Sequence, residues 1–133
     1  MSITRTELWK SATFSIERIE GQASRTVIFR ITGPFNARDM YGSMKQIALG
    51  NIFDSKAAPG TENPILHVFD ISAVPQMDSS ALGMIVSHHI SCRGKGIRVV
   101  AVGPNPNVIQ LFKFTKVDTL IPTAATLEDA LRS

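Results

Sequence analysis

The sequence predicts an α/β fold in which a mixed β-sheet of four to five strands carries about four α-helices packed on it. Two early segments, residues 13–19 and 25–32, alternate apolar and polar residues on either side of a polar turn, which is typical of an antiparallel hairpin. Two later segments, residues 65–69 and 97–102, are almost continuously apolar, as strands covered on both faces are. Segments with helical spacing alternate with these later strands, and that order implies parallel pairing with helices packed on the sheet.

Length and composition indicate a folded globular protein. The chain has 133 residues, of which 44% are hydrophobic and 19% are charged. We therefore expect a single domain over residues 1–133, with residues 1–12 as an N-terminal extension. Within the extension, Leu8 and Trp9 are interpreted as covering either a sheet edge or a partner surface.

Charge and cysteine content limit the partners and the compartment. The net charge of +3 comes from dispersed lysines and arginines, without the basic runs and interleaved aromatics that favour nucleic-acid binding. The single cysteine, Cys92, excludes an internal disulfide and suits a reducing compartment. The apolar runs are too short to span a bilayer, and residues 1–10 contain no apolar signal segment. We expect a cytoplasmic protein with no nucleic-acid partner and no membrane insertion, either a monomer or a weak dimer.

The remaining elements follow from caps, breakers and periodicity. Asn36 is a good N-cap for a helix over residues 37–49, and the polar, turn-rich residues 55–63 predict a loop. The elements expected after that loop are a strand at 64–71, a helix at 82–92 ended by Gly94 and Gly96, a strand at 97–102, a helix at 107–114, a short strand at 119–121 and a final helix capped by Thr126 that runs through residue 131.

The most informative stretch reads Met-Asp-Ser-Ser-Ala-Leu-Gly over residues 77–83. Asp78 is a strong N-cap candidate, because its carboxylate can accept hydrogen bonds from the unpaired amides of the first helical turn. Ser79 and Ser80 then lie where a helix carries partial positive charge, so a phosphate on either hydroxyl would be favourably placed. Taken alone, however, the Asp-Ser-Ser segment favours a plain helix cap.

Motifs for catalysis and metal binding are weak. His88 and Cys92 are four residues apart and share a helix face, but two ligands do not make a zinc site and His67 lies within a strand. The two serines lack the Gly-x-Ser-x-Gly elbow of serine hydrolases, and helical geometry places His88 and His89 two turns away. No glycine-rich phosphate loop is present. We therefore expect no enzyme activity, no catalytic residue, no metal and no cofactor.

The pattern resembles the STAS domain family, the sulfate-transporter and anti-sigma-factor-antagonist superfamily. The resemblance rests first on Asp-Ile-Ser at residues 70–72 followed by the 77–83 stretch. It continues through the strand at 97–102, the Val-x-x-Leu-Phe helix at 108–112 and the tail at 127–131, and it covers the chain from about Phe14 to the end. The resemblance implies a STAS fold.

A stand-alone domain of this length is most similar to a bacterial anti-sigma factor antagonist, or anti-anti-sigma factor. The resemblance implies partner switching, in which the antagonist binds an anti-sigma factor that is also a serine kinase and so releases the sigma factor. The kinase phosphorylates the first serine of the motif, which corresponds to Ser79, and a phosphoserine phosphatase reverses the modification. Ser80 is then the neighbour and not the acceptor.

We expect the partner-binding surface to surround this helix start. Its residues are Pro75, Gln76, Met77, Asp78, Ser79, Ser80, Leu82 and Met84. For Leu82, as for Ile85, burial in the core is the competing interpretation. Two other functions stay open: a STAS scaffold or subunit of a stressosome-like complex or lipid-transport ABC system without a phosphoswitch, and a small enzyme with Ser79 as nucleophile.

Overall fold

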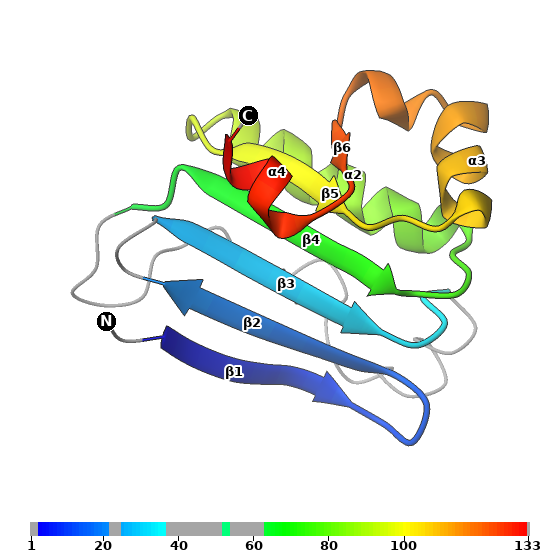
Figure 1. Ribbon diagram of the computed structural model, residues 1–133, viewed down its shortest axis with the longest axis horizontal. Helices are drawn as coiled ribbons and strands as arrows, with labels where there is room; N and C mark the ends of the chain where they lie inside the picture. Colours follow the sequence, from blue (N-terminus) through cyan, green and yellow to red (C-terminus); the bar gives the residue numbers. More distant parts are fainter. Residues whose placement is uncertain (1–2, 22–24, 37–51, 54–62, 133) are drawn as a thin grey trace.

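The computed structural model describes residues 3–21, 25–36, 52–53 and 63–132. Within them, six strands form one mixed sheet in the order β1-β2-β3-β4-β5-β6 (Figure 1). Strands β1 to β3 pair antiparallel, and β3 to β6 pair parallel. The strands are Ile3–Lys10 (β1), Ser15–Gly21 (β2), Thr26–Thr32 (β3), Leu66–Ala73 (β4), Arg98–Val102 (β5) and Thr123–Ala124 (β6). The predicted mixed α/β sheet is confirmed, with more strands than the four to five expected.

The N-terminal segment, expected to be an extension of the domain, contributes the edge strand β1. It pairs antiparallel with β2, with an irregularity between Glu7 and Trp9. Most of its side chains are exposed, and Leu8 and Trp9 are the partly buried ones that pack against the core. These two residues therefore cover the sheet edge. The strand was missed because a mostly exposed strand shows little alternation between apolar and polar residues.

Helices cover both faces of the sheet. Helix α2 (Ser79–Arg93) and helix α3 (Pro106–Phe114) pack on one face, and helix α4 (Leu127–Arg132) packs on the other (Figure 1). On β4, Phe69 and Ile71 belong to the cluster that includes α2, whereas Leu66 and Val68 pack with Ala130 of α4. Strand β4 is thus buried on both faces, as its continuous apolar sequence predicts.

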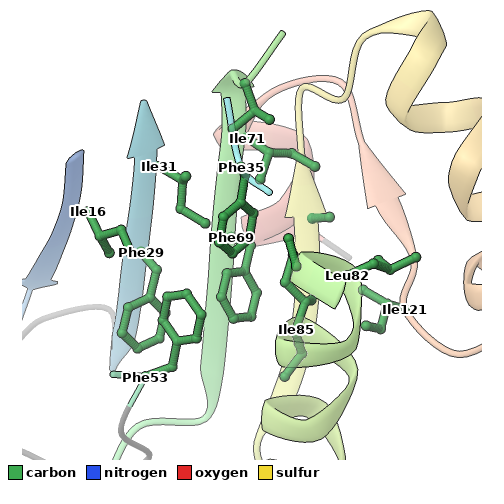
Figure 2. Packing of buried hydrophobic residues seen from close by; sticks show 14 of the residues in the cluster. Ile16, Phe29, Ile31, Phe35, Phe53, Phe69, Ile71, Leu82, Ile85 and Ile121 are labelled. Carbon is green, nitrogen blue, oxygen red and sulfur yellow. The ribbon is translucent and has the colours of Figure 1, made fainter. Parts of the chain in front are cut away.

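Aromatic rings fill the larger core. Phe29 of β3 and Phe69 of β4 stack with ring centroids 5.3 Å apart, and Phe53 meets them edge-on at 5.1 and 5.0 Å (Figure 2). Such offset and edge-to-face contacts add to the hydrophobic gain of burying the rings. The helix predicted at residues 37–49 and most of the predicted loop at residues 55–63 lie outside the described residues.

The C-terminal elements agree with the prediction except at one place. No strand forms at residues 119–121; Val117–Thr119 instead form a 3₁₀ helix (η2), and the strand comes later, as β6. Ile121 is apolar because it is fully buried in the core, not because it pairs in the sheet. Thr126 caps α4 as predicted, since its Oγ1 accepts a hydrogen bond from the Asp129 amide at 3.2 Å. In the described part of the chain, none of the helices has the length and hydropathy needed to span a membrane.

Candidate functional site

The start of α2 has the cap geometry that the sequence predicts. Asp78 is extended, with φ −101° and ψ 174°, and its Oδ1 accepts a hydrogen bond from the Ala81 amide at 2.8 Å. The helix therefore begins at Ser79, directly after the predicted cap residue. Ser79 and Ser80 are its first two residues and both are exposed. Both hydroxyls therefore lie at the positive end of the helix dipole. The first turn contains no acidic residue.

Phe35, a buried residue just after β3, holds the segment before α2. The Phe35 amide donates to the carbonyl oxygen of Gln76 at 3.0 Å, and the Asp78 amide donates to the carbonyl oxygen of Phe35 at 3.3 Å. These bonds form a short parallel bridge between Phe35 and Met77. The Phe35 ring is fully buried, so the core fixes the backbone immediately before Ser79.

Asn105, the N-cap of α3, holds the same segment from the other side. Its Oδ1 accepts a hydrogen bond from the Val108 amide at 2.9 Å. Its Nδ2 donates to the carbonyl oxygens of Val74 at 3.1 Å and of Pro75 at 2.9 Å. One side chain thus caps α3 and joins it to the segment that precedes α2. This role of Asn105 was not predicted from the sequence, although an asparagine directly before Pro106 has the pattern of an N-cap followed by a first-turn proline.

The end of β4 beneath this loop is tightly packed and polar. Gly103 has φ +73°, and a Cβ atom placed on it would lie 2.7 Å from the Cβ of Ser72. Asp70 accepts hydrogen bonds from the Ser72 amide at 3.1 Å, from the Ser72 hydroxyl at 2.7 Å and from Arg30 Nε at 3.1 Å. Burial favours a higher pKa for Asp70, but these hydrogen bonds and the Arg30 charge outweigh it and hold the pKa below its ordinary value.

The predicted partner-binding residues fall into three groups. Pro75, Gln76, Ser79 and Ser80 are exposed around the helix start, and Met77, Asp78 and Met84 are half-buried. Leu82 is only 2% exposed and belongs to the core cluster. Its assignment to the partner surface is corrected, because its side chain holds α2 on the sheet. The other six residues lie with Ser79 at the start of α2 or directly before it.

A second cluster lies at the opposite end of α2. The sequence analysis set His67 apart from His88 and Cys92 because it lies in a strand. In the structure that strand packs against α2, and the three side chains meet in the core. Burial raises the pKa of the Cys92 thiol to about 11, although Lys95 and Arg18 act in the opposite direction. The thiol is therefore protonated at neutral pH.

Comparison with solved structures shows the fold. The anti-sigma factor antagonist SpoIIAA in its unphosphorylated form is 18% identical, with a TM-score of 0.61 over 89% of this chain and 92% of that chain. An anti-sigma factor antagonist from Mycobacterium paratuberculosis is 21% identical, with a TM-score of 0.60 over 98% and 92%. A sulfate transporter family protein from Wolinella succinogenes is 16% identical, with a TM-score of 0.59 over 81% and 83%. At such identities the likeness is one of fold alone.

Comparison of sequences shows the family. A search of curated proteins found no significant match. The family model of the STAS domain, however, matches residues 16–130. The match begins in β2, ends in α4 and includes the start of α2 with its two exposed serines. The chain therefore belongs to the STAS domain family.

Proposed function

We propose that this protein is an anti-sigma factor antagonist that acts by partner switching in the cytoplasm. Its partner is an anti-sigma factor that is also a serine kinase, and phosphorylation of Ser79 by that kinase ends the complex. A phosphoserine phosphatase restores binding. Two of the similar structures are described as anti-sigma factor antagonists, which supports this choice among the functions of STAS domains.

The observation that carries the proposal is the position of Ser79. Its hydroxyl is exposed on the first residue of α2, and the backbone before it is held by Phe35 and Asn105. A kinase can reach this hydroxyl without unfolding the chain. A partner that docks on the same rigid surface also comes close to it, so a modification there changes the interface directly.

The energetics of a phosphate at Ser79 suit a switch. A phosphate adds about −1.5 to −2 charges, and a helix N-terminus stabilises such a charge by about 0.3–1 kcal/mol. In a docked complex the same charge lies beside Asp78, loses water and repels acidic groups of the partner. A difference of about 3 kcal/mol between the two states weakens binding roughly a hundredfold. The switch therefore needs no refolding.

The geometry around Ser79 supports a non-enzymatic role. Nine residues of α-helix separate Ser79 from His88, which is about 13 Å along the axis. The His88 ring instead contacts His67 and Cys92 in the core. A serine nucleophile needs a base within hydrogen-bonding distance, and this histidine is directed elsewhere.

The test is phosphorylation by candidate serine kinases from the same genome, followed by intact-mass measurement and phosphopeptide mapping. We expect one phosphate on the wild type and on Ser80→Ala, and none on Ser79→Ala. A label on Ser80 alone, or on another residue, would contradict the assignment. A partner complex that persists while none of the kinases phosphorylates the protein would favour a scaffold or transport-complex subunit instead.

A further inference from the structure

A buried cluster of two imidazoles and one thiol lies in the core between β4 and α2. His67 is near the start of β4, and His88 and Cys92 lie on successive turns of α2. Their exposed fractions are 0%, 6% and 0%. Packing of the helix on the strand therefore brings together three metal-ligating side chains that no short motif in the sequence connects.

The ligand atoms of this cluster point toward one another. His67 Nδ1 lies 2.8 Å from His88 Nε2, and Cys92 Sγ lies 3.3 Å from His88 Nε2 and 3.7 Å from His67 Nδ1. The imidazole centroids are 5.0 Å apart. Because the two nitrogens are much closer than the ring centres, the rings turn these nitrogens toward each other. Without a metal, the short N···N contact is a hydrogen bond in which one ring nitrogen donates to the other, and the tautomer decides which.

We propose that His67, His88 and Cys92 form a binding site for a Cu(I) ion, held by two imidazole nitrogens and one thiolate. With metal–nitrogen bonds of about 2.0 Å, a metal–sulfur bond of about 2.3 Å and trigonal angles, ligand nitrogens stand about 3.5 Å apart and nitrogen and sulfur about 3.7 Å apart. The two N···S distances, 3.3 and 3.7 Å, agree with this geometry to within a few tenths of an ångström. The two imidazole nitrogens must separate by about 0.7 Å.

The charge of the site selects the metal. Cu(I) and one thiolate sum to zero, and a neutral site avoids the cost of burying a net charge. The walls are apolar, since the rings of Phe29, Phe53 and Phe69 lie with centroids 5.3, 6.0 and 5.5 Å from that of His88. Soft thiolate ligation suits Cu(I) as well.

Zn(II) fits the same residues less well. It would leave the site with one positive charge, while Arg18 and Lys95 already act electrostatically on Cys92. It also prefers four ligands, and within the described ranges no carboxylate joins the three side chains.

Binding exchanges one proton for the Cu(I) ion, without a redox step. The Cys92 thiol releases its proton to solvent, and the proton between the two imidazoles moves to a ring nitrogen that faces away. Two Cu–N bonds and one Cu–S bond form, and copper stays in the +1 state. The bound ion ties β4 to α2, the helix that carries Ser79 at its other end.

The test uses the full chain, refolded from urea under anaerobic conditions with Cu(I) and a competing chromophoric chelator. Refolding in the presence of the metal gives the ion access to the buried site. We expect one copper per chain, with an X-ray absorption edge of three-coordinate Cu(I). Cys92→Ser and His88→Gln should each lower the affinity on the order of 100-fold or more. His89→Gln, the matched control on the same helix, should bind like the wild type.

Circular dichroism before loading identifies variants that fail to fold, and His67→Gln then replaces any variant that does. The proposal is overturned if the refolded wild type retains no copper against the chelator. It is also overturned if the folded cluster variants bind copper as tightly as the His89→Gln control. Tighter binding of Zn(II) than of Cu(I) in direct competition would overturn the assignment of the metal.

Discussion

Asn105 and Pro75 are joined by a hydrogen bond of 2.9 Å from the side-chain amide of one to the backbone carbonyl of the other. The bond links the start of α3 to the segment that leads into α2. Because the same asparagine caps α3, the position of the exposed serines depends on a helix that is remote from them in the sequence. One side chain thus holds the starts of two helices together.

Replacing Asn105 should separate its two roles. Asn105→Ala removes the cap and both donated hydrogen bonds, and should lower the free energy of unfolding by about 1–3 kcal/mol. Asn105→Asp keeps the cap acceptor but loses the donors to Val74 and Pro75, so it should still speed exchange of the backbone amides of residues 76–78. Urea denaturation and hydrogen exchange measure the two effects. If these amides exchange in Asn105→Asp at the wild-type rate, the hydrogen bonds from Asn105 to Val74 and Pro75 do not hold this segment.

A charge at Ser79 should affect folding and binding in opposite directions. Ser79→Asp places a carboxylate at the helix N-terminus and should raise the free energy of unfolding by about 0.3–1 kcal/mol. The same variant should weaken partner binding, whereas Ser79→Ala should bind like the wild type. Ser87→Asp, which adds the same charge at an exposed position in the middle of α2, is the control and should leave affinity unchanged. Equal affinity of Ser79→Asp and Ser79→Ala in calorimetry would argue against an electrostatic switch.

A charge at Met77 tests the docking surface itself. Met77 is half-buried and immediately precedes the cap residue. Met77→Glu should weaken partner binding by about tenfold or more, since a carboxylate buried without a partner costs more than 1.4 kcal/mol. Ile90→Glu is the matched variant, because Ile90 is 56% exposed near the other end of α2. Both proteins are checked by circular dichroism, and an unchanged affinity of folded Met77→Glu would place the interface elsewhere.

Asp70 should make the free energy of unfolding depend on pH in the acidic range. Its pKa in the folded state is below the ordinary value of 3.8, because hydrogen bonds from Ser72 and Arg30 outweigh the opposing effect of burial. A group with a lowered folded pKa stabilises the fold above its unfolded pKa, and that stabilisation is lost as pH falls through the folded pKa. The difference in unfolding free energy between the wild type and Asp70→Asn should be constant from about pH 5 to 7 and shrink below about pH 4. A difference that grows on acidification would have the wrong sign.

Gly103 and Gly96 have the same φ, so alanine variants at the two positions separate the cost of backbone strain from the cost of a clash of the added Cβ. Gly103 and Gly96 both have φ +73°, but an added Cβ would meet Ser72 at 2.7 Å only at Gly103, and nothing within 4 Å at Gly96. Alanine at either position is strained by about 1–2 kcal/mol. Gly103→Ala should cost about 1–3 kcal/mol more, because the end of β4 must also move. Equal unfolding free energies for the two variants would show that this packing is loose.

The parts of the fold that were predicted depend on short-range patterns. Alternation predicted β2 and β3, and continuous apolar runs predicted β4 and β5. The cap at Asp78 is confirmed by its hydrogen bond from the Ala81 amide. The edge strand β1 was missed because its exposed side chains carry little pattern. The strand expected at residues 119–121 was wrong, because burial against a helix and burial in a sheet select the same apolar residues.

The sequence by itself determined strands β2 to β5, the caps of α2 and α4, and the exposed serine at the start of α2. These features depend on residues within about one helical turn of each other, so they can be read locally. Only the tertiary structure decided that Phe35 and Asn105 clamp the segment before Ser79, that Leu82 is core, and that His67 meets His88 and Cys92. Those contacts join residues on different elements, and their geometry is set by strand register and by helix packing on the sheet.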